Sequence, residues 1–100
     1  MRVKSEISKE VLTNVLYYFS KNLPAFSVME IQRASEHPDD AYVYMVIAKR
    51  KENPFPGIMG DYSCWTSWNE STQSLNCGHY GLKTLQEARE ICKEHFYRVI

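Results

Sequence analysis

Two cysteine and histidine pairs have residue types and spacing that could bind a metal. Cys77 and His79 are two positions apart, and Cys92 and His95 are three positions apart. Side chains two apart share a face of a strand and those three apart share a face of a helix, so all four could converge on zinc. Their spacing lacks the short Cys-Cys and His-His steps of known zinc fingers. A small zinc-binding domain is therefore one hypothesis, and burial of Cys92 as a small apolar residue is the competing one.

The same side chains could instead supply a nucleophile and its base, because catalytic partners meet in space rather than in sequence. The candidates are Cys64, Cys77 and Cys92 as nucleophile, with His79 or His95 as base. A reactive thiolate favours an exposed, electropositive position, whereas these cysteines fall within strand and helix patterns. We therefore predict no catalytic activity and no cofactor, with zinc as the alternative.

Aromatic residues, which make up 13% of the chain, are the second group that could bind a partner. Tyr and Trp contribute strongly to protein contacts. The segment 52–60 is rich in proline and glycine and also carries large apolar residues such as Ile58. These apolar residues either pin the segment over the core as a long loop or form a contact surface. The predicted binding residues are Tyr42, Tyr44, Trp65, Phe55 and Met59.

Charge limits the class of partner. The chain has 12 Lys plus Arg and 12 Asp plus Glu, for a formal net charge of zero. It therefore lacks the long-range positive field that favours binding to a phosphate backbone. A near-neutral protein resists self-association poorly. We predict a protein partner or self-association as a dimer, and the alternative is a nucleic-acid-binding domain that stacks bases on the same aromatics.

Localisation can be predicted from the ends, the hydropathy and the cysteines. The segment 1–6 is mixed in charge and no apolar run follows it, so we expect no signal peptide. No stretch approaches the roughly 20 apolar residues that span a bilayer. Three cysteines are an odd number without framework spacing, which fits reduced thiols. The predicted location is the cytoplasm, away from membranes.

The first half of the chain shows one helical pattern and two strand patterns. Apolar residues recur at steps of three and four from Ser8 to about Lys21, and Pro24 follows, which predicts a helix. Residues 25–33 and 41–51 alternate as strands do, with turn residues at 35–40 between them. The second strand is apolar on both sides, which is typical of a central or half-covered strand.

The second half predicts a hairpin followed by a helix. Residues 61–69 and 73–80 read as paired strands around a polar turn. Thr84 and Glu87 have the spacing of a capping box, in which Glu87 reaches back to the N-cap amide. The helix that follows extends to about Arg98, and Cys92 lies on its apolar stripe.

These elements predict an α+β fold in a single domain of residues 1–100. The expected order is α-β-β-β-β-α, with an antiparallel sheet of three to four strands. We expect the N-terminal and C-terminal helices to pack on one face of the sheet, with Tyr42 and Tyr44 on the opposite face. The predicted function is a small non-catalytic protein-interaction or regulatory module that binds through this aromatic face and the 52–60 loop.

Overall fold

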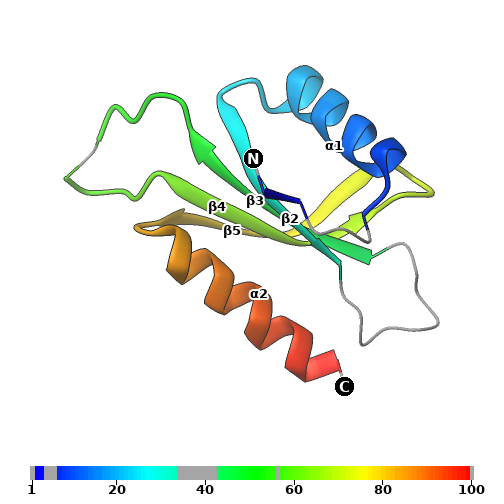
Figure 1. Cartoon of the computed structure of the whole chain (residues 1–100). Coiled ribbons are helices and arrows are strands. Elements are labelled where there is room, and N and C mark those ends of the chain that lie inside the picture. Colours follow the sequence, from blue (N-terminus) through cyan, green and yellow to red (C-terminus); the bar gives the residue numbers. More distant parts are fainter. Residues whose placement is uncertain (1, 4–6, 34–42, 56, 100) are drawn as a thin grey trace.

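A computed structural model describes residues 2–3, 7–33, 43–55 and 57–99 of the chain. In this part of the chain, a five-stranded sheet lies between two helices (Figure 1). The elements are β1 (Arg2–Val3), α1 (Lys9–Asn22), β2 (Phe26–Arg33), β3 (Val43–Arg50), β4 (Tyr62–Asn69), β5 (Ser74–Leu82) and α2 (Leu85–Val99). The predicted class and the order α-β-β-β-β-α are confirmed. The predicted turn at 35–40 lies outside the described residues.

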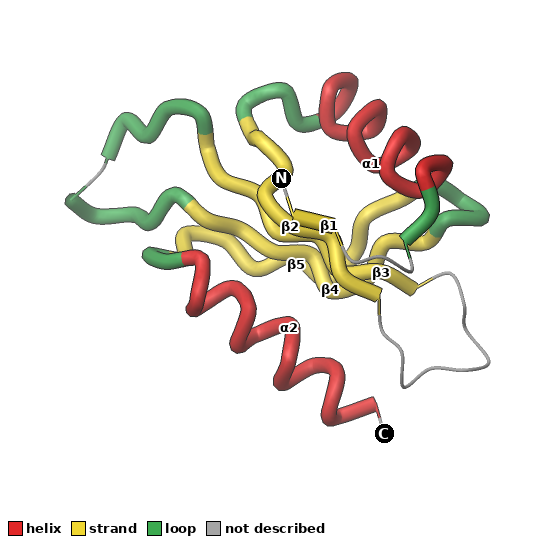
Figure 2. Tube along the Cα trace, viewed as in Figure 1, coloured by secondary structure: helices red, strands yellow, loops and turns green. Residues whose placement is uncertain are grey.

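The sheet has the spatial order β1-β2-β3-β4-β5 (Figure 2). Strands β2 to β5 form an antiparallel series in which each strand pairs with the next along the chain. Strand β1 was not predicted; it pairs in parallel with β2, with Arg2 opposite Glu30 and Val3 opposite Ile31. Two residues are too few to show the alternation that identifies a strand from sequence.

The two helices cover opposite faces of the sheet (Figure 1). Tyr44, Val46 and Ala48 of β3 belong to the core beneath α1. Met45 and Ile47 of the same strand belong to the core beneath α2. The prediction that both helices pack on one face is therefore wrong. Strand β3 is apolar on both sides, and without a second helix one of its apolar faces would remain in water.

The helix starts follow from local sequence. The Ser8 hydroxyl accepts a hydrogen bond from the Val11 amide at 3.3 Å, which caps α1. At α2, the Glu87 amide donates to the Thr84 hydroxyl at 3.1 Å. The Glu87 carboxylate accepts from the Lys83 amide at 2.9 Å, one residue before the N-cap amide that we predicted. Neither helix is long and apolar enough, over its described residues, to cross a membrane.

A buried carboxylate fixes α2 to the sheet. Glu30 of β2 is 3% exposed. The Arg89 guanidinium of α2 donates to it from Nη2 at 2.8 Å and from Nε at 3.1 Å. Gln32 also donates to Glu30, at 2.8 Å. A buried charge is stable only when it is paired and hydrogen-bonded, so this contact favours one position of α2 on its face.

A second polar contact fixes α1 to the turn between β4 and β5. The Glu70 carboxylate accepts a hydrogen bond from the Asn14 amide of α1 at 2.7 Å. Its other oxygen accepts from the Trp68 indole at 3.0 Å, and Trp68 itself is fully buried. The indole N–H therefore keeps a partner inside the core.

Candidate interaction surface

The predicted aromatic face of the sheet is not open. Tyr44 is 7% exposed and Trp65 is 3% exposed. Trp65 makes an edge contact with Phe19 of α1 at a centroid distance of 5.4 Å. Tyr42 lies outside the described residues. The prediction that Tyr44 and Trp65 line an exposed binding face is wrong, because α1 covers the side of the sheet on which they lie.

The described residues do not assemble the predicted zinc ligands. Cys92 of α2 is buried in the same core as Cys64, whereas Cys77 and His79 of β5 are exposed. The side chain of His95 is not among those described. Within the described part of the chain, no three His, Cys, Asp or Glu side chains gather as a metal site would require. Cys92 instead occupies the core position that the competing hypothesis gave it.

The buried thiol of Cys92 is a poor nucleophile. A hydrogen bond with Cys64, together with burial, raises the pKa of Cys92 well above its usual range. The thiol is the unreactive form of cysteine, and a reactive cysteine needs the opposite shift. The same hydrogen bond lowers the pKa of Cys64, against the opposite effect of its burial. Both side chains are buried in one core cluster.

The loop between β3 and β4 is held by one asparagine. The Asn53 side-chain amide donates to the Met59 carbonyl at 2.7 Å and to an Asp61 carboxylate oxygen at 2.6 Å. Its side-chain oxygen accepts from the Phe55 amide at 2.8 Å. One asparagine side chain offers both donors and an acceptor, so it can close a loop without help from the core. This segment was recognised in the sequence only by its prolines, glycines and apolar residues, and this role of Asn53 was not predicted.

Two large apolar side chains of this loop point into solvent. Phe55 is 58% exposed and Ile58 is 85% exposed, whereas Met59 is half-buried. Met59 turns toward Gly81 at the end of β5. The loop is thus pinned by hydrogen bonds and by Met59, while Phe55 and Ile58 remain available for contact. Ile58 was not in the predicted binding set, although its place in a loop rich in proline and glycine was the available signal.

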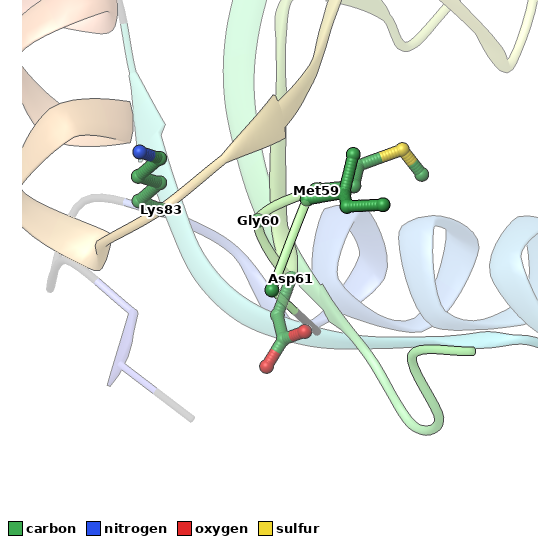
Figure 3. A pocket seen from close by; sticks show the side chains of 6 residues that line it. Met59, Gly60, Asp61 and Lys83 are labelled. Carbon is green, nitrogen blue, oxygen red and sulfur yellow. The ribbon is translucent and has the colours of Figure 1, made fainter. Parts of the chain in front are cut away.

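The loop borders a hollow of about 330 Å³ beside the start of α2 (Figure 3). Gly60 is one of its lining residues, and a side chain at this position would collide with the Leu82 carbonyl. Asp61 and Lys83 contribute one charge of each sign. Its lining residues are Gly57, Ile58, Met59, Gly60, Asp61 and Lys83. This lining offers apolar and charged groups for binding.

The fold and this surface define a small α+β domain with exposed apolar side chains between β3 and β4. The chain belongs to the family large polyvalent protein associated domain 24, whose model matches residues 10–86. The match begins in α1, contains β2 to β5 with the loop between them, and ends at the second residue of α2. No curated protein and no solved structure matches the chain significantly. The family description gives no biochemical role.

Proposed function

We propose that this domain is a non-catalytic protein-interaction module that binds its partner through the 52–60 loop. The observation that carries the proposal is the exposure of Phe55 and Ile58 on a loop whose backbone is fixed by Asn53. Large apolar side chains are effective anchors when they enter a partner's pocket. A loop that is already ordered loses little conformational entropy on binding. The family description, a domain associated with large polyvalent proteins, is compatible with such a role.

Burial of the two side chains would contribute most of the affinity. Full burial of an apolar side chain of this size is worth ~1.5–3 kcal/mol. Asp61 and Lys83 lie on the rim of the adjacent hollow, where they can orient a partner. Loss of both anchors should therefore weaken binding by at least about 100-fold, since every 1.4 kcal/mol is tenfold.

A protein partner is favoured over nucleic acid by the charges and by the buried aromatics. The chain has zero formal net charge. Stacking of bases needs open aromatic faces, and the Tyr44 and Trp65 rings lie beneath α1. The absence of catalysis and of a cofactor is part of the proposal, supported by the burial of the Cys64 and Cys92 thiols. A reducing cytoplasm suits these free thiols.

Photo-crosslinking followed by calorimetry tests the proposal. A benzophenone amino acid at position 58 should give a discrete protein adduct in cells, and the same probe at position 17 on α1 should not. The adduct partner, once purified, should bind Phe55→Ser/Ile58→Ser at least about 100-fold more weakly than the unchanged chain. The matched control is Leu16→Ser/Tyr17→Ser, which removes two apolar side chains that are 39% and 57% exposed on α1.

Two results would contradict the proposal. One is the lack of any protein adduct at position 58. The other is equal affinity of the purified partner for the loop variant and the unchanged chain. The control variant should bind within about threefold of the unchanged chain, because surface changes away from an interface typically cost under ~0.5 kcal/mol.

A further inference from the structure

The two edges of the sheet are protected differently. Strand β1 pairs with the outer edge of β2 over two residues. Strand β5 is the last strand on the other side, and no described residue pairs with its outer edge (Figure 2). Asn76, Cys77, His79 and Tyr80 of β5 are exposed. The β5 edge therefore presents unpaired backbone amides and carbonyls, which can pair with another strand.

Strand β5 lacks the residues that usually keep an edge from pairing. Its nine residues, Ser74–Leu82, include no Lys, Arg, Asp, Glu or Pro. Among the described strands, only β4 and β5 lack charged residues, and β4 is central. Natural edge strands are commonly blocked by charge, by proline or by being short. A strand of this length without those residues is thus an available pairing surface, with one irregularity where its pairing with β4 shifts register opposite Tyr62 and Cys64.

The backbone at Cys77 is a second, independent feature of this edge. Its φ is +58°, in the left-handed region that side chains other than glycine rarely adopt. Cys77 lies in mid-strand, next to Gly78, which pairs with Trp65 of β4. Such a conformation is strained and is found preferentially at functional sites. The unusual residue therefore falls at the middle of this edge.

We propose that two copies of this chain associate by antiparallel pairing of their β5 edges, near Cys77 and Gly78. Antiparallel pairing of a strand with its own copy is two-fold symmetric, which is the commonest symmetry of protein dimers. Each β5 side chain then faces side chains of the same strand. Because β5 contains no Lys, Arg, Asp or Glu, self-pairing places none of these like charges opposite each other, whereas an edge that carried them would repel its copy. The dimer has one continuous ten-stranded sheet, counted as twice the five strands described.

The exposed Cys77 thiol allows the paired β5 strands to be detected by crosslinking. Antiparallel neighbours directly opposite or diagonal have Cβ atoms within about 8 Å. Cys64 and Cys92 are buried, so Cys77 is the accessible thiol among the three. A short bismaleimide should link two copies of the native protein through Cys77, and Cys77→Ser should abolish the link while leaving the sedimentation mass that of a dimer.

Charges placed on the edge should break the dimer. Asn76→Lys/His79→Lys puts two lysines on β5, and we expect the dimer dissociation constant to rise by about tenfold or more, because like charges on paired strands repel. The matched control, Thr13→Lys/Gln86→Lys, adds the same charge at exposed helix positions and should change the constant by less than about twofold. Far-ultraviolet circular dichroism verifies that both variants fold. A monomeric native protein, or a dimer with equal dissociation constants in both variants, overturns the proposal.

The proposed dimer contact at the β5 edge and the proposed partner contact at the 52–60 loop can be tested separately. The variant Phe55→Ser/Ile58→Ser leaves the β5 edge unchanged, so it should keep the dimer while losing the loop's partner. A dimer that dissociates in the loop variant but not in the edge variant would assign self-association to the loop instead, and would overturn the edge proposal.

Discussion

The sheet face beneath α1 and the loop between β3 and β4 carry similar side chains and use them differently. Tyr44 and Trp65 lie under α1 at 7% and 3% exposure, while Phe55 and Ile58 stand in solvent at 58% and 85%. Residue type does not separate the two regions, since all four are large and apolar or aromatic. What separates them is the presence of a helix above the sheet and of a hydrogen-bonded frame around the loop. An apolar residue becomes a contact residue only where the fold leaves it uncovered.

The largest expected effect is a loss of stability, and it tests the sheet face that α1 covers. Trp68 is fully buried and packs edge-on against Tyr18 at a centroid distance of 5.4 Å. Trp68→Ala should lower the free energy of unfolding by ~3–5 kcal/mol through lost burial and a cavity. Phe55→Ala, on the open loop, should change it by less than ~0.5 kcal/mol. Urea unfolding measures both, and equal losses would remove the distinction between the two regions.

A smaller loss of stability tests how the loop between β3 and β4 packs against the end of β5. A Cβ at Gly60 would collide with the Leu82 carbonyl, whereas a Cβ at Gly57 meets nothing within 4 Å. Gly60→Ala should cost ~1–3 kcal/mol of stability, because the backbone must move apart. Gly57→Ala is the matched control and should stay within ~0.5 kcal/mol. If thermal unfolding shows equal stability for the two variants, Gly60 does not pack against the Leu82 backbone of β5.

The smallest expected effect is on the pH dependence of the free energy of unfolding. It compares the buried thiol of Cys92 with the exposed thiol of Cys77. The raised pKa of Cys92 means that the native state keeps the proton after the unfolded chain releases it, at about pH 8.5. This stabilisation is complete below that pH and is lost as pH rises above it, at up to ~1.4 kcal/mol per pH unit. Urea unfolding from pH 8 upward should therefore show a shallower slope for Cys92→Ala than for the unchanged chain.

The exposed thiol supplies the control for that experiment. Cys77→Ser removes a thiol from the open β5 edge, so this variant should keep the slope of the unchanged chain. An unaltered slope in Cys92→Ala would mean that its thiol is not sequestered in the native state.

Local patterns in the sequence were enough to predict the elements. The apolar repeat after Ser8, the capping pair Thr84 and Glu87, and the breakers in 52–60 each depend on neighbours a few residues away. The predicted element ends differ from those observed by at most two residues. Local backbone preference and side-chain period are properties of short segments, so a sequence read alone can recover them.

The side of the sheet that each helix covers depends on contacts distant in sequence. Strand β3 was recognised as apolar on both faces, and that observation already favoured cover on both sides. The expectation of an open aromatic face followed from placing the helices together, and it failed for Tyr44 and Trp65. The three hydrogen bonds of Asn53 were also beyond prediction, since asparagine marks many turns that it does not close.

The pairing of Glu30 with Arg89 sets a minimum length for an independently folding piece. The family match ends at residue 86, three residues before Arg89. A fragment cut at that boundary would keep the buried Glu30 carboxylate and lose the guanidinium that faces it at 2.8 Å. It would also uncover Met45 and Ile47, which α2 shields. A fragment ending at residue 86 should therefore be less stable than one with the whole of α2, and expression boundaries for this domain should be chosen to include that helix.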